Sequence, residues 1–225
     1  MERSMFDTLL CLPLFQGLGH GDLTRIVEST RITFNTLKHE TTFLRQGDAC
    51  EGLTFVIDGT VEVHTDAADR KWSVAEELAL PAVIGTEVLY GRTRTHLYSC
   101  MACTTTHILY IDKRTAAALT GYFEVFRLNL LNLLTTSIAR REQLQWLPPA
   151  KTLEGRIVYF MHSHVLRPAG MKRFHIALPE LGAYLGEDPR YISAALHKLE
   201  DSGLIRLGRR LIEVPSFERL LQNNK

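Results

Sequence analysis

Six side chains on one face of a short predicted helix carry the clearest chemistry in this sequence. From Asp188 to Gly203 the chain is "DPRYISAALHKLEDSG", in which Ile192, Leu196 and Leu199 recur at spacings of four and three and form one apolar stripe. The opposite face holds Arg190, Tyr191, Ser193, Ala194, His197 and Lys198. The polar groups among these can bond to phosphate oxygens and base edges, so the face suits a nucleic acid.

The residues at the ends of this helix predict its boundaries. Asp188 is a good N-cap, and Pro189 stands at the first helical position, where its missing N–H costs nothing. Gly203 can adopt the left-handed conformation that ends a helix. Upstream, "LPELGAYLG" predicts a shorter amphipathic helix on Leu178, Leu181 and Leu185, closed by Gly186. Two short helices joined by a tight glycine turn indicate a helix-turn-helix.

A small β-hairpin is expected directly after the second helix. The segment "LIRLGRRLIEV" alternates around a Gly208-Arg209 turn, which is typical of a wing. Lys198 and the wing residues Arg206, Arg209 and Arg210 are expected to hold phosphates, and so to set affinity rather than sequence preference. The alternative for the whole motif is a plain helical hairpin packed into another core. The alternative for Arg190 alone is a solvated side chain paired with Glu187.

The charge distribution agrees with a nucleic-acid partner for the C-terminal part. Residues 1–147 hold 14 Lys and Arg against 17 Asp and Glu, a net charge of −3, whereas residues 148–225 hold 12 against 8, a net charge of +4. The basic excess therefore coincides with the predicted helix-turn-helix, where phosphates require it.

The elements that must position this face divide the chain into three parts. Residues 1–112 comprise a short helical segment, with Asp22 as a candidate cap, and then short alternating strands with turn residues every 8–12 positions. Glycines stand at the expected corners: Gly47, Gly52, Gly59, Gly85 and Gly91. This pattern predicts an antiparallel β-roll whose interior could hold a ligand. Residues 113–149 are expected to form a long helix and a hinge, and residues 150–225 the winged helix-turn-helix domain.

The long helix, predicted over 123–147, contains no Pro or Gly and ends at Pro148-Pro149. Five apolar residues and one serine form a coiled-coil-like stripe along it: Leu130, Leu131, Leu134, Ser137, Ile138 and Leu144. Such a surface would aggregate if left exposed, so we expect self-association, the alternative being burial on the roll of the same chain.

Composition excludes several other classes of protein. Hydrophobic residues at 45% and charged residues at 23% are ordinary for a globular protein. No apolar run has the length of a membrane span, and Asp7 interrupts the short apolar patch at the start, so neither a membrane protein nor a signal peptide is expected. Four cysteines are too few for a disulfide scaffold, which favours a cytoplasmic protein with reduced thiols. The sequence contains no catalytic motif, so an enzyme is not expected. A His-x-His pair inside a roll could bind a metal ion, but His162 and His164 lie outside the predicted roll.

The order of these segments resembles the CRP/FNR transcription regulators over nearly the whole chain. "FLRQGD" and "LTFVIDGTVEV" resemble the roll pattern of the family at Gln46, Gly47, Gly59 and Val61. "VIGTEVLYG" resembles the start of its effector-binding cassette, "SIARREQ" its dimerisation helix, "LEGRIVYF" the entrance to its DNA-binding domain, and "LGEDPRYISAALHKLEDSGLI" its recognition unit. "PRYIS" is closer to the YeiL-like branch than to the cyclic-AMP receptor.

The resemblance implies an α+β fold: a cyclic-nucleotide-binding-like antiparallel β-roll (a double-stranded β-helix), a long dimerisation helix and a C-terminal winged helix-turn-helix. It implies a homodimer with Leu131, Leu134 and Ile138 on the two-fold axis, a palindromic double-stranded DNA operator, a small-molecule effector and RNA polymerase as a candidate partner. Within the family's Arg-Glu-x-x-x-Arg triad, Arg190 takes the Glu position, while Pro189 and Ala194 replace the two arginines. The usual half-site therefore cannot be assumed.

The effector pocket departs from the pattern of the cyclic-AMP-binding members. Aligned on Gly85, the sequence has Thr86 where a Glu would bind the ribose, and His96 and Leu97 where an Arg-Ser pair would bind the phosphate. Other candidate pocket residues are offset from these positions: Glu87, Arg92 and Arg94. Pro81 also stands where the roll pattern of the family has its third glycine. Cyclic AMP is therefore not expected as the effector, whose identity stays unknown.

A redox or metal sensor is the alternative regulator. Of the four cysteines only Cys11 is near the N-terminus, Cys50 follows a turn, and Cys100 and Cys103, three apart on a strand, point to opposite faces. An iron–sulfur cluster is therefore not expected. Haem bound through His64, His96 or His107 is expected even less. A ligand-sensing roll whose helical tail docks protein is a further alternative, which salt-sensitive binding to DNA would argue against.

Overall fold

The computed structural model describes residues 5–223, which form two compact units. One unit contains residues up to Val61 together with 78–140, and the other contains 62–77 and the chain from Arg141 onward. The strands at 62–77 thus cluster with the C-terminal part, although the sequence placed them in the roll. The division into 1–112, 113–149 and 150–225 stays a prediction.

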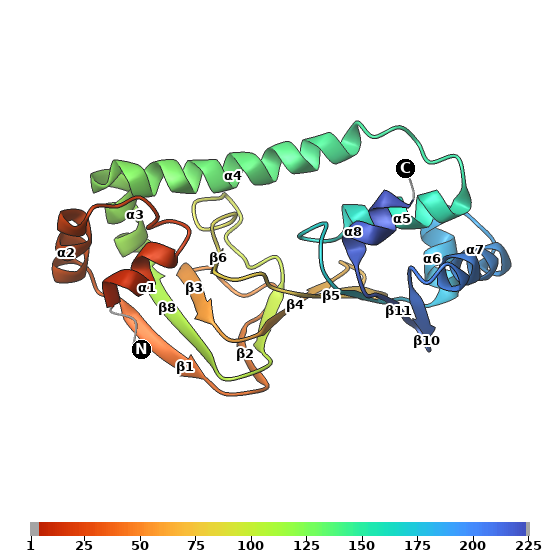
Figure 1. The fold of residues 1–225 in the computed structure, drawn as a ribbon, viewed down its shortest axis with the longest axis horizontal. Helices are drawn as coiled ribbons and strands as arrows, with labels where there is room; N and C mark the ends of the chain where they lie inside the picture. The colour runs from red at the N-terminus through yellow and green to blue at the C-terminus, as the bar shows by residue number, and fades with distance from the viewer. Residues whose placement is uncertain (1–4, 224–225) are drawn as a thin grey trace. The chain divides into compact units, whose positions relative to one another are not determined.

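The first unit is an antiparallel β-structure with helices from both ends of its sequence (Figure 1). Its strands are β1 (Thr33–Leu37), β2 (Thr41–Leu44), β3 (Gly52–Asp58), β6 (Ala82–Ile84), β7 (Ser99–Ala102) and β8 (Thr106–Asp112). Its helices are α1 (Met5–Cys11), α2 (His20–Ser29), α3 (Lys113–Tyr122) and most of α4 (Glu124–Gln145). The order β1-β8-β3-β6 makes one sheet, and β2 pairs with β7.

The two central strands build the core of this unit. Leu53 and Phe55 of β3 and Leu109 and Ile111 of β8 are fully buried. Alternation is not strict, because β3 is buried without interruption over residues 52–56. Phe15 packs on the Phe55 ring and on the Phe126 ring of α4, with 5.3 Å between the centroids in each pair. The N-terminal segment and α4 therefore cover this part of the sheet.

Two local predictions in this unit need correction. Asp22 is not the cap of α2, because the N-cap is Gly19 and Asp22 lies in the first turn, where its carboxylate pairs with Arg25 at 2.6 Å. The single helix predicted over 123–147 begins at Glu124 and is preceded by a separate helix, α3, that the sequence analysis did not define. Among the described residues no helix is both long and apolar enough to cross a membrane.

The second unit combines a β-sheet with a cluster of short helices. Its strands are β4 (Val61–Asp66), β5 (Ser73–Glu77), β9 (Lys172–His175), β10 (Arg206–Gly208) and β11 (Leu211–Val214). Its helices are α5 (Leu153–Ser163), α6 (Leu178–Leu185), α7 (Pro189–Asp201) and α8 (Phe217–Gln222). The sheet order is β10-β11-β9-β5-β4, so the β4–β5 hairpin extends the sheet of the predicted wing.

The helices of this unit pack through the apolar stripes that the sequence indicated. Ile192, Leu196 and Leu199 of α7 are buried, as is Leu181 of α6, together with Phe160 of α5. Most of their surface is removed from water, and each such side chain contributes roughly 1.5–3 kcal/mol relative to exposure. The apolar sides of α6 and α7 are thus covered by the core of this unit, and the polar face of α7 is left outward.

Candidate nucleic-acid interface

The turn between α6 and α7 has the geometry that the glycines predict. Gly186 ends α6 at φ = 68°, in the left-handed region that favours glycine. Gly182 lies inside α6, and a Cβ there would come within 2.6 Å of the Glu187 carbonyl oxygen, so only glycine lets the turn close this tightly. The Asp188 carboxylate accepts a hydrogen bond from the Arg190 N–H at 2.8 Å and caps α7 as predicted.

Arg190 extends from the first turn of α7 into solvent, with its side chain 91% exposed. Its Nε lies 3.3 Å from Asp188 Oδ1, on the capping carboxylate. The alternative pairing of Arg190 with Glu187 is wrong, because Glu187 Oε1 accepts from Arg156 Nη1 at 2.6 Å. A pair as exposed as Arg190 and Asp188 is worth at most about 1 kcal/mol, so the guanidinium can exchange it for another acceptor.

The other predicted residues lie along the same outward face of α7. Tyr191, Ala194, His197 and Lys198 are exposed, and Ser193 is half-buried. His197 Nδ1 lies 3.3 Å from Glu200 Oε2. Lys198 Nζ lies 2.8 Å from Glu154 Oε1 of α5, and this hydrogen bond lowers the pKa of Glu154. Lys198 and Arg190 each have a carboxylate partner, but Arg190 and Tyr191, near the N-terminus of α7, present the more open surface.

The wing differs by one residue from its predicted form. Gly208 pairs with Leu211 across the hairpin, so the turn consists of Arg209 and Arg210 rather than Gly208 and Arg209. Arg210 has φ = 55°, a conformation that side-chain-bearing residues rarely adopt. Arg206 Nη1 lies 3.2 Å from Glu213 Oε1 on the neighbouring strand. Arg209 and Arg210 are both exposed at the tip, and within residues 5–223 neither forms an ion pair.

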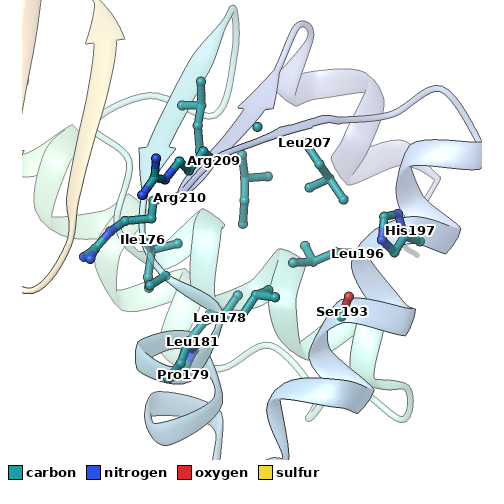
Figure 2. Close-up of a pocket in the computed structure, with 14 residues that line it drawn as sticks. Ile176, Leu178, Pro179, Leu181, Ser193, Leu196, His197, Leu207, Arg209 and Arg210 are labelled. Carbon is teal, nitrogen blue, oxygen red and sulfur yellow. The ribbon is translucent and has the colours of Figure 1, made fainter.

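A groove of about 440 Å³ separates α7 from the wing. Ser193 and His197 line one side, the wing tip lines the other, and Leu196 lies between them (Figure 2). Figure 2 also shows the guanidinium groups of Arg209 and Arg210 on the side of the wing away from His197. Leu178, predicted to be a core residue of α6, is 38% exposed and lines this groove instead.

The predicted effector residues of the first unit divide into buried and exposed groups. Gly85, Thr86 and His96 are buried, while Leu97 is 43% exposed. The side chains with the charge or acidity that a nucleotide would require are exposed: Glu87, Arg92 and Arg94. Thr86 and His96, which the sequence alignment on Gly85 set at the family's ribose and phosphate contacts, are therefore buried. The assignment of these residues to an effector pocket stays a prediction.

His96 is tied into the backbone of this region. Its N–H donates to the Asp48 carbonyl at 2.9 Å, and its carbonyl accepts from the Gly47 N–H at 2.9 Å. Burial lowers the pKa of the imidazole, although Asp48 and Glu87 oppose this effect. The neutral ring is therefore favoured, and a neutral ring cannot replace an arginine opposite a cyclic phosphate.

Two of the four cysteines, Cys50 and Cys100, are buried as packed thiols, whereas Cys11 is exposed and Cys103 is half-buried. Burial raises the pKa of the Cys100 thiol to about 12, and burial also raises the pKa of Cys50, whose Sγ lies 3.4 Å from the Gly52 carbonyl oxygen. A raised pKa disfavours the thiolate that a metal requires. Strand β7 ends at Ala102, so the alternation argument for Cys100 does not extend to Cys103. All four cysteines lie in the described range and none is in a disulfide.

The residues predicted for dimerisation lie on α4 with different exposure. Leu131 and Ile138 are 49% and 60% exposed, and so is Leu128 at 54%. Leu134 is half-buried and packs against the core of its own unit, as does the buried Leu130. Part of the predicted stripe is therefore occupied within the chain, and an outward row on α4 is left exposed.

Comparison with known proteins finds similarity in the β-structure and in the overall fold. Residues 34–121 match the model of the cyclic nucleotide-binding domain. A protein from Eubacterium rectale assigned to the CRP/FNR family of transcriptional regulators is 17% identical over 94% of this chain and 97% of its own, with a TM-score of 0.51. The Thermus thermophilus catabolite activator protein is 20% identical over 94% of this chain and 97% of its own, with a TM-score of 0.48. A search of curated proteins finds no match.

These findings support the fold. Residues 34–121 are similar to cyclic nucleotide-binding domains, and the chain shares the α+β fold of a CRP/FNR regulator, as the sequence motifs predicted. The placement in the YeiL-like branch stays a prediction.

Proposed function

We propose that this protein is a sequence-specific DNA-binding transcription regulator. The observation that carries the proposal is the outward face of α7, which is capped by Asp188, buried on its apolar side and open at Arg190 and Tyr191. Only the major groove of B-DNA admits a helix and presents a distinct pattern for each base pair. In a helix-turn-helix the N-terminal residues of the second helix meet the base edges, and these are the residues that α7 exposes.

Arg190 is the first candidate for base contact in this proposal. A guanidinium can donate two hydrogen bonds to guanine O6 and N7, and such a contact is worth roughly 1–3 kcal/mol of discrimination. Tyr191 would contact a thymine methyl group or a phosphate, and Ser193, Ala194 and His197 lie further along the same face. Because the Asp188 carboxylate lies beside Arg190, its competition for the guanidinium would further restrict the sites that are bound well.

The phosphate contacts would come from Lys198 and the wing. Lys198 and Arg206 must exchange their carboxylate partners, Glu154 and Glu213, for phosphates. Arg209 and Arg210 have no such pair to break among the described residues. We therefore expect these two arginines to make the larger contribution to nonspecific affinity.

We further propose a homodimer through α4. Leu131 and Ile138 supply the exposed apolar row, and a second copy of the same helix would cover it. Leu134 would contribute only at the edge of this contact, because part of its side chain is already packed against the core of the first unit. Two recognition helices about 34 Å apart would call for a palindromic operator with half-sites one turn apart. RNA polymerase is the candidate protein partner.

The effector proposed for residues 34–121 is a small molecule other than cyclic AMP. A cyclic phosphate needs a cation in a partly buried site. The buried candidates are Gly85, Thr86 and His96, and the arginines Arg92 and Arg94 are exposed. These surroundings favour a ligand without a phosphate.

Selection of DNA sites by wild type, Arg190→Ala and Arg209→Ala tests the regulator. We expect Arg190→Ala to lose preference at one symmetric base pair, and Arg209→Ala to keep the selected sequence with a shallower dependence of affinity on salt. Identical selected sequences for wild type and Arg190→Ala would remove Arg190 from the base contacts. Failure of the wild type to bind any duplex in a salt-dependent manner would refute the proposed function.

A further inference from the structure

The β4–β5 hairpin is built into the same compact unit as the predicted DNA-binding elements. Strand β5 pairs antiparallel with β9, with Ser73 opposite His175 and Glu76 opposite Lys172. Strand β9 pairs in turn with β11 of the wing. The hairpin and the wing are therefore parts of one sheet, and the positions of their tips are fixed by a continuous set of strand pairings.

Side chains reinforce this arrangement at two positions, one directly before β5 and one within it. The ring of Trp72 makes edge contacts with Phe160 and His164, with centroids 5.1 and 4.7 Å away. Four residues further on, buried Glu76 accepts from Lys172 Nζ at 2.7 Å and from the Leu166 N–H at 2.7 Å. The hairpin tip is thus anchored within a few residues of its turn.

A cationic pocket of about 350 Å³ lies between the hairpin tip and the wing tip. Four permanent cations line it together with one carboxylate and one imidazole: Arg70, Lys71, Arg209, Arg210, Asp66 and His175. Arg70, like the wing arginines, forms no ion pair within the described part of the chain. Lys71 is 3.6 Å from Asp69, and both side chains are more than half exposed, so that pair is weak.

The excess of cations makes this pocket attractive to anions. Burial, followed by Arg173 and His64, lowers the pKa of His175, so this side chain is not counted among the cations. The four cations are exposed, and solvent screens much of their mutual repulsion, which a bound anion would reduce further. Phosphate oxygens satisfy such a site, because arginine and lysine donate to them in charge-assisted hydrogen bonds.

We propose that the tip of the β4–β5 hairpin is a phosphate-binding extension of the DNA interface, with Arg70 and Lys71 as its contact residues. Arg209 and Arg210 line both this pocket and the largely apolar groove beside Ser193 and His197, so the wing tip adjoins both cavities. The guanidinium groups of both wing arginines lie on the side of the wing away from His197 (Figure 2). This inference rests on the proposed function, and it adds residues that the DNA-binding motif itself does not contain.

The salt dependence of binding to a duplex without an operator tests the proposal, because phosphate contacts do not depend on sequence. In the full-length protein, Arg70→Gln/Lys71→Gln should lower the slope of log affinity against log salt by about 1.8 per protomer, since each neutralised phosphate contributes about 0.9. The matched control is Arg167→Gln/Arg219→Gln, which removes the same charge from two exposed arginines of this unit that line neither cavity. The control should keep the wild-type slope.

Three results would overturn the inference, and they have different meanings. If the wild type binds with a steep slope that Arg209→Gln lowers but Arg70→Gln/Lys71→Gln does not, the DNA-binding function stands and the hairpin contact is refuted. If the control lowers the slope equally, net charge and not a built site is responsible. If the hairpin variant binds DNA normally but loses affinity for inorganic pyrophosphate, the pocket serves a free phosphate ligand and not DNA.

Lys71→Gln alone provides a second variant that leaves the backbone at Arg70 untouched. Arg70 has φ = 56°, and glutamine at that position keeps a side chain of similar size in the same strained turn. The single variant should lower the slope by about 0.9 per protomer. Unchanged circular dichroism and melting temperature should accompany both variants, since the two side chains are exposed.

Discussion

The buried ion pair between Glu76 and Lys172 is the most sensitive point of the second unit. Their side chains are 4% and 1% exposed, and the Nζ to Oε2 distance is 2.7 Å. Glu76 also accepts from the Leu166 N–H at 2.7 Å and from the Arg167 N–H at 3.4 Å. One carboxylate therefore satisfies an ammonium group and two backbone donors, and no water can replace it without opening the sheet.

Glu76→Gln should destabilise this unit by about 3–5 kcal/mol, the range observed when one partner of a buried pair is lost and an uncompensated charge stays behind. The amide nitrogen adds a donor where Lys172 and Leu166 already supply donors. For a chain of this size, each kcal/mol corresponds to roughly 2–4 °C in melting temperature, so a shift on the order of 10 °C is expected. Such a loss is a large part of the roughly 5–15 kcal/mol that stabilises a typical domain.

Thermal and urea unfolding followed by tryptophan fluorescence would measure the loss, because Trp72 packs in the affected unit whereas Trp146 is 84% exposed. Glu77→Gln is the matched control: it is the next residue on the same strand, and its side chain is exposed. The double variant Glu76→Gln/Lys172→Met removes both charges, keeps an amide oxygen that can accept from the Leu166 N–H, and should recover much of the loss, since no ion is then left buried. A cost below about 1 kcal/mol for Glu76→Gln would refute the reasoning, because that is the scale of an exposed pair.

Three further outcomes are expected. Ile138→Glu should convert a dimer to a monomer in light scattering, because like charges would meet in a dry seam at a cost of several kcal/mol; a fully dimeric variant would place the interface elsewhere. Cyclic AMP and cyclic GMP should bind no better than millimolar in calorimetry, and micromolar affinity would mean that Arg92 or Arg94 reaches the phosphate. Burial lowers the pKa of folded His96 below its ordinary 6.5, so the unfolded chain binds more protons on acidification. Stability should therefore be complete above pH ~6.5 and decline as pH falls through that value, and His96→Gln should flatten the decline measured by urea unfolding between pH ~8 and ~5.

Local signals in the sequence predicted the parts of this fold that are held by near neighbours. The N-cap bond of Asp188 spans two residues, the α7 stripe repeats within 13, and the left-handed glycines act at single positions. Each of these could be inferred from the side chains themselves. The match of residues 34–121 to a known domain and the overall α+β fold confirm what the motifs indicated.

The partners of charged side chains and the pairing of distant strands could not be predicted in this way. Alternation indicates that 73–77 is a strand, but it does not name β9, about a hundred residues away, as the neighbour. One signal was available: Glu76 stands at a strand position whose neighbours, Val74 and Ala75, are apolar, and so requires a buried cation. Arg70 and Lys71 carried no comparable signal, since charged residues in a turn are usually only solvated.

The proposed division between sequence recognition and affinity follows from the composition of the two surfaces. α7 exposes a single arginine near its N-terminus, because Pro189 and Ala194 stand where the CRP/FNR pattern has arginines. One bidentate contact discriminates by roughly 1–3 kcal/mol, which is little against a genome of competing sites. Binding at an operator would then depend on phosphate contacts that hold α7 in register. The cations at the wing and hairpin tips are placed on rigid strand pairings and are suited to that positioning, so their loss should weaken binding at every sequence while leaving the preferred sequence unchanged.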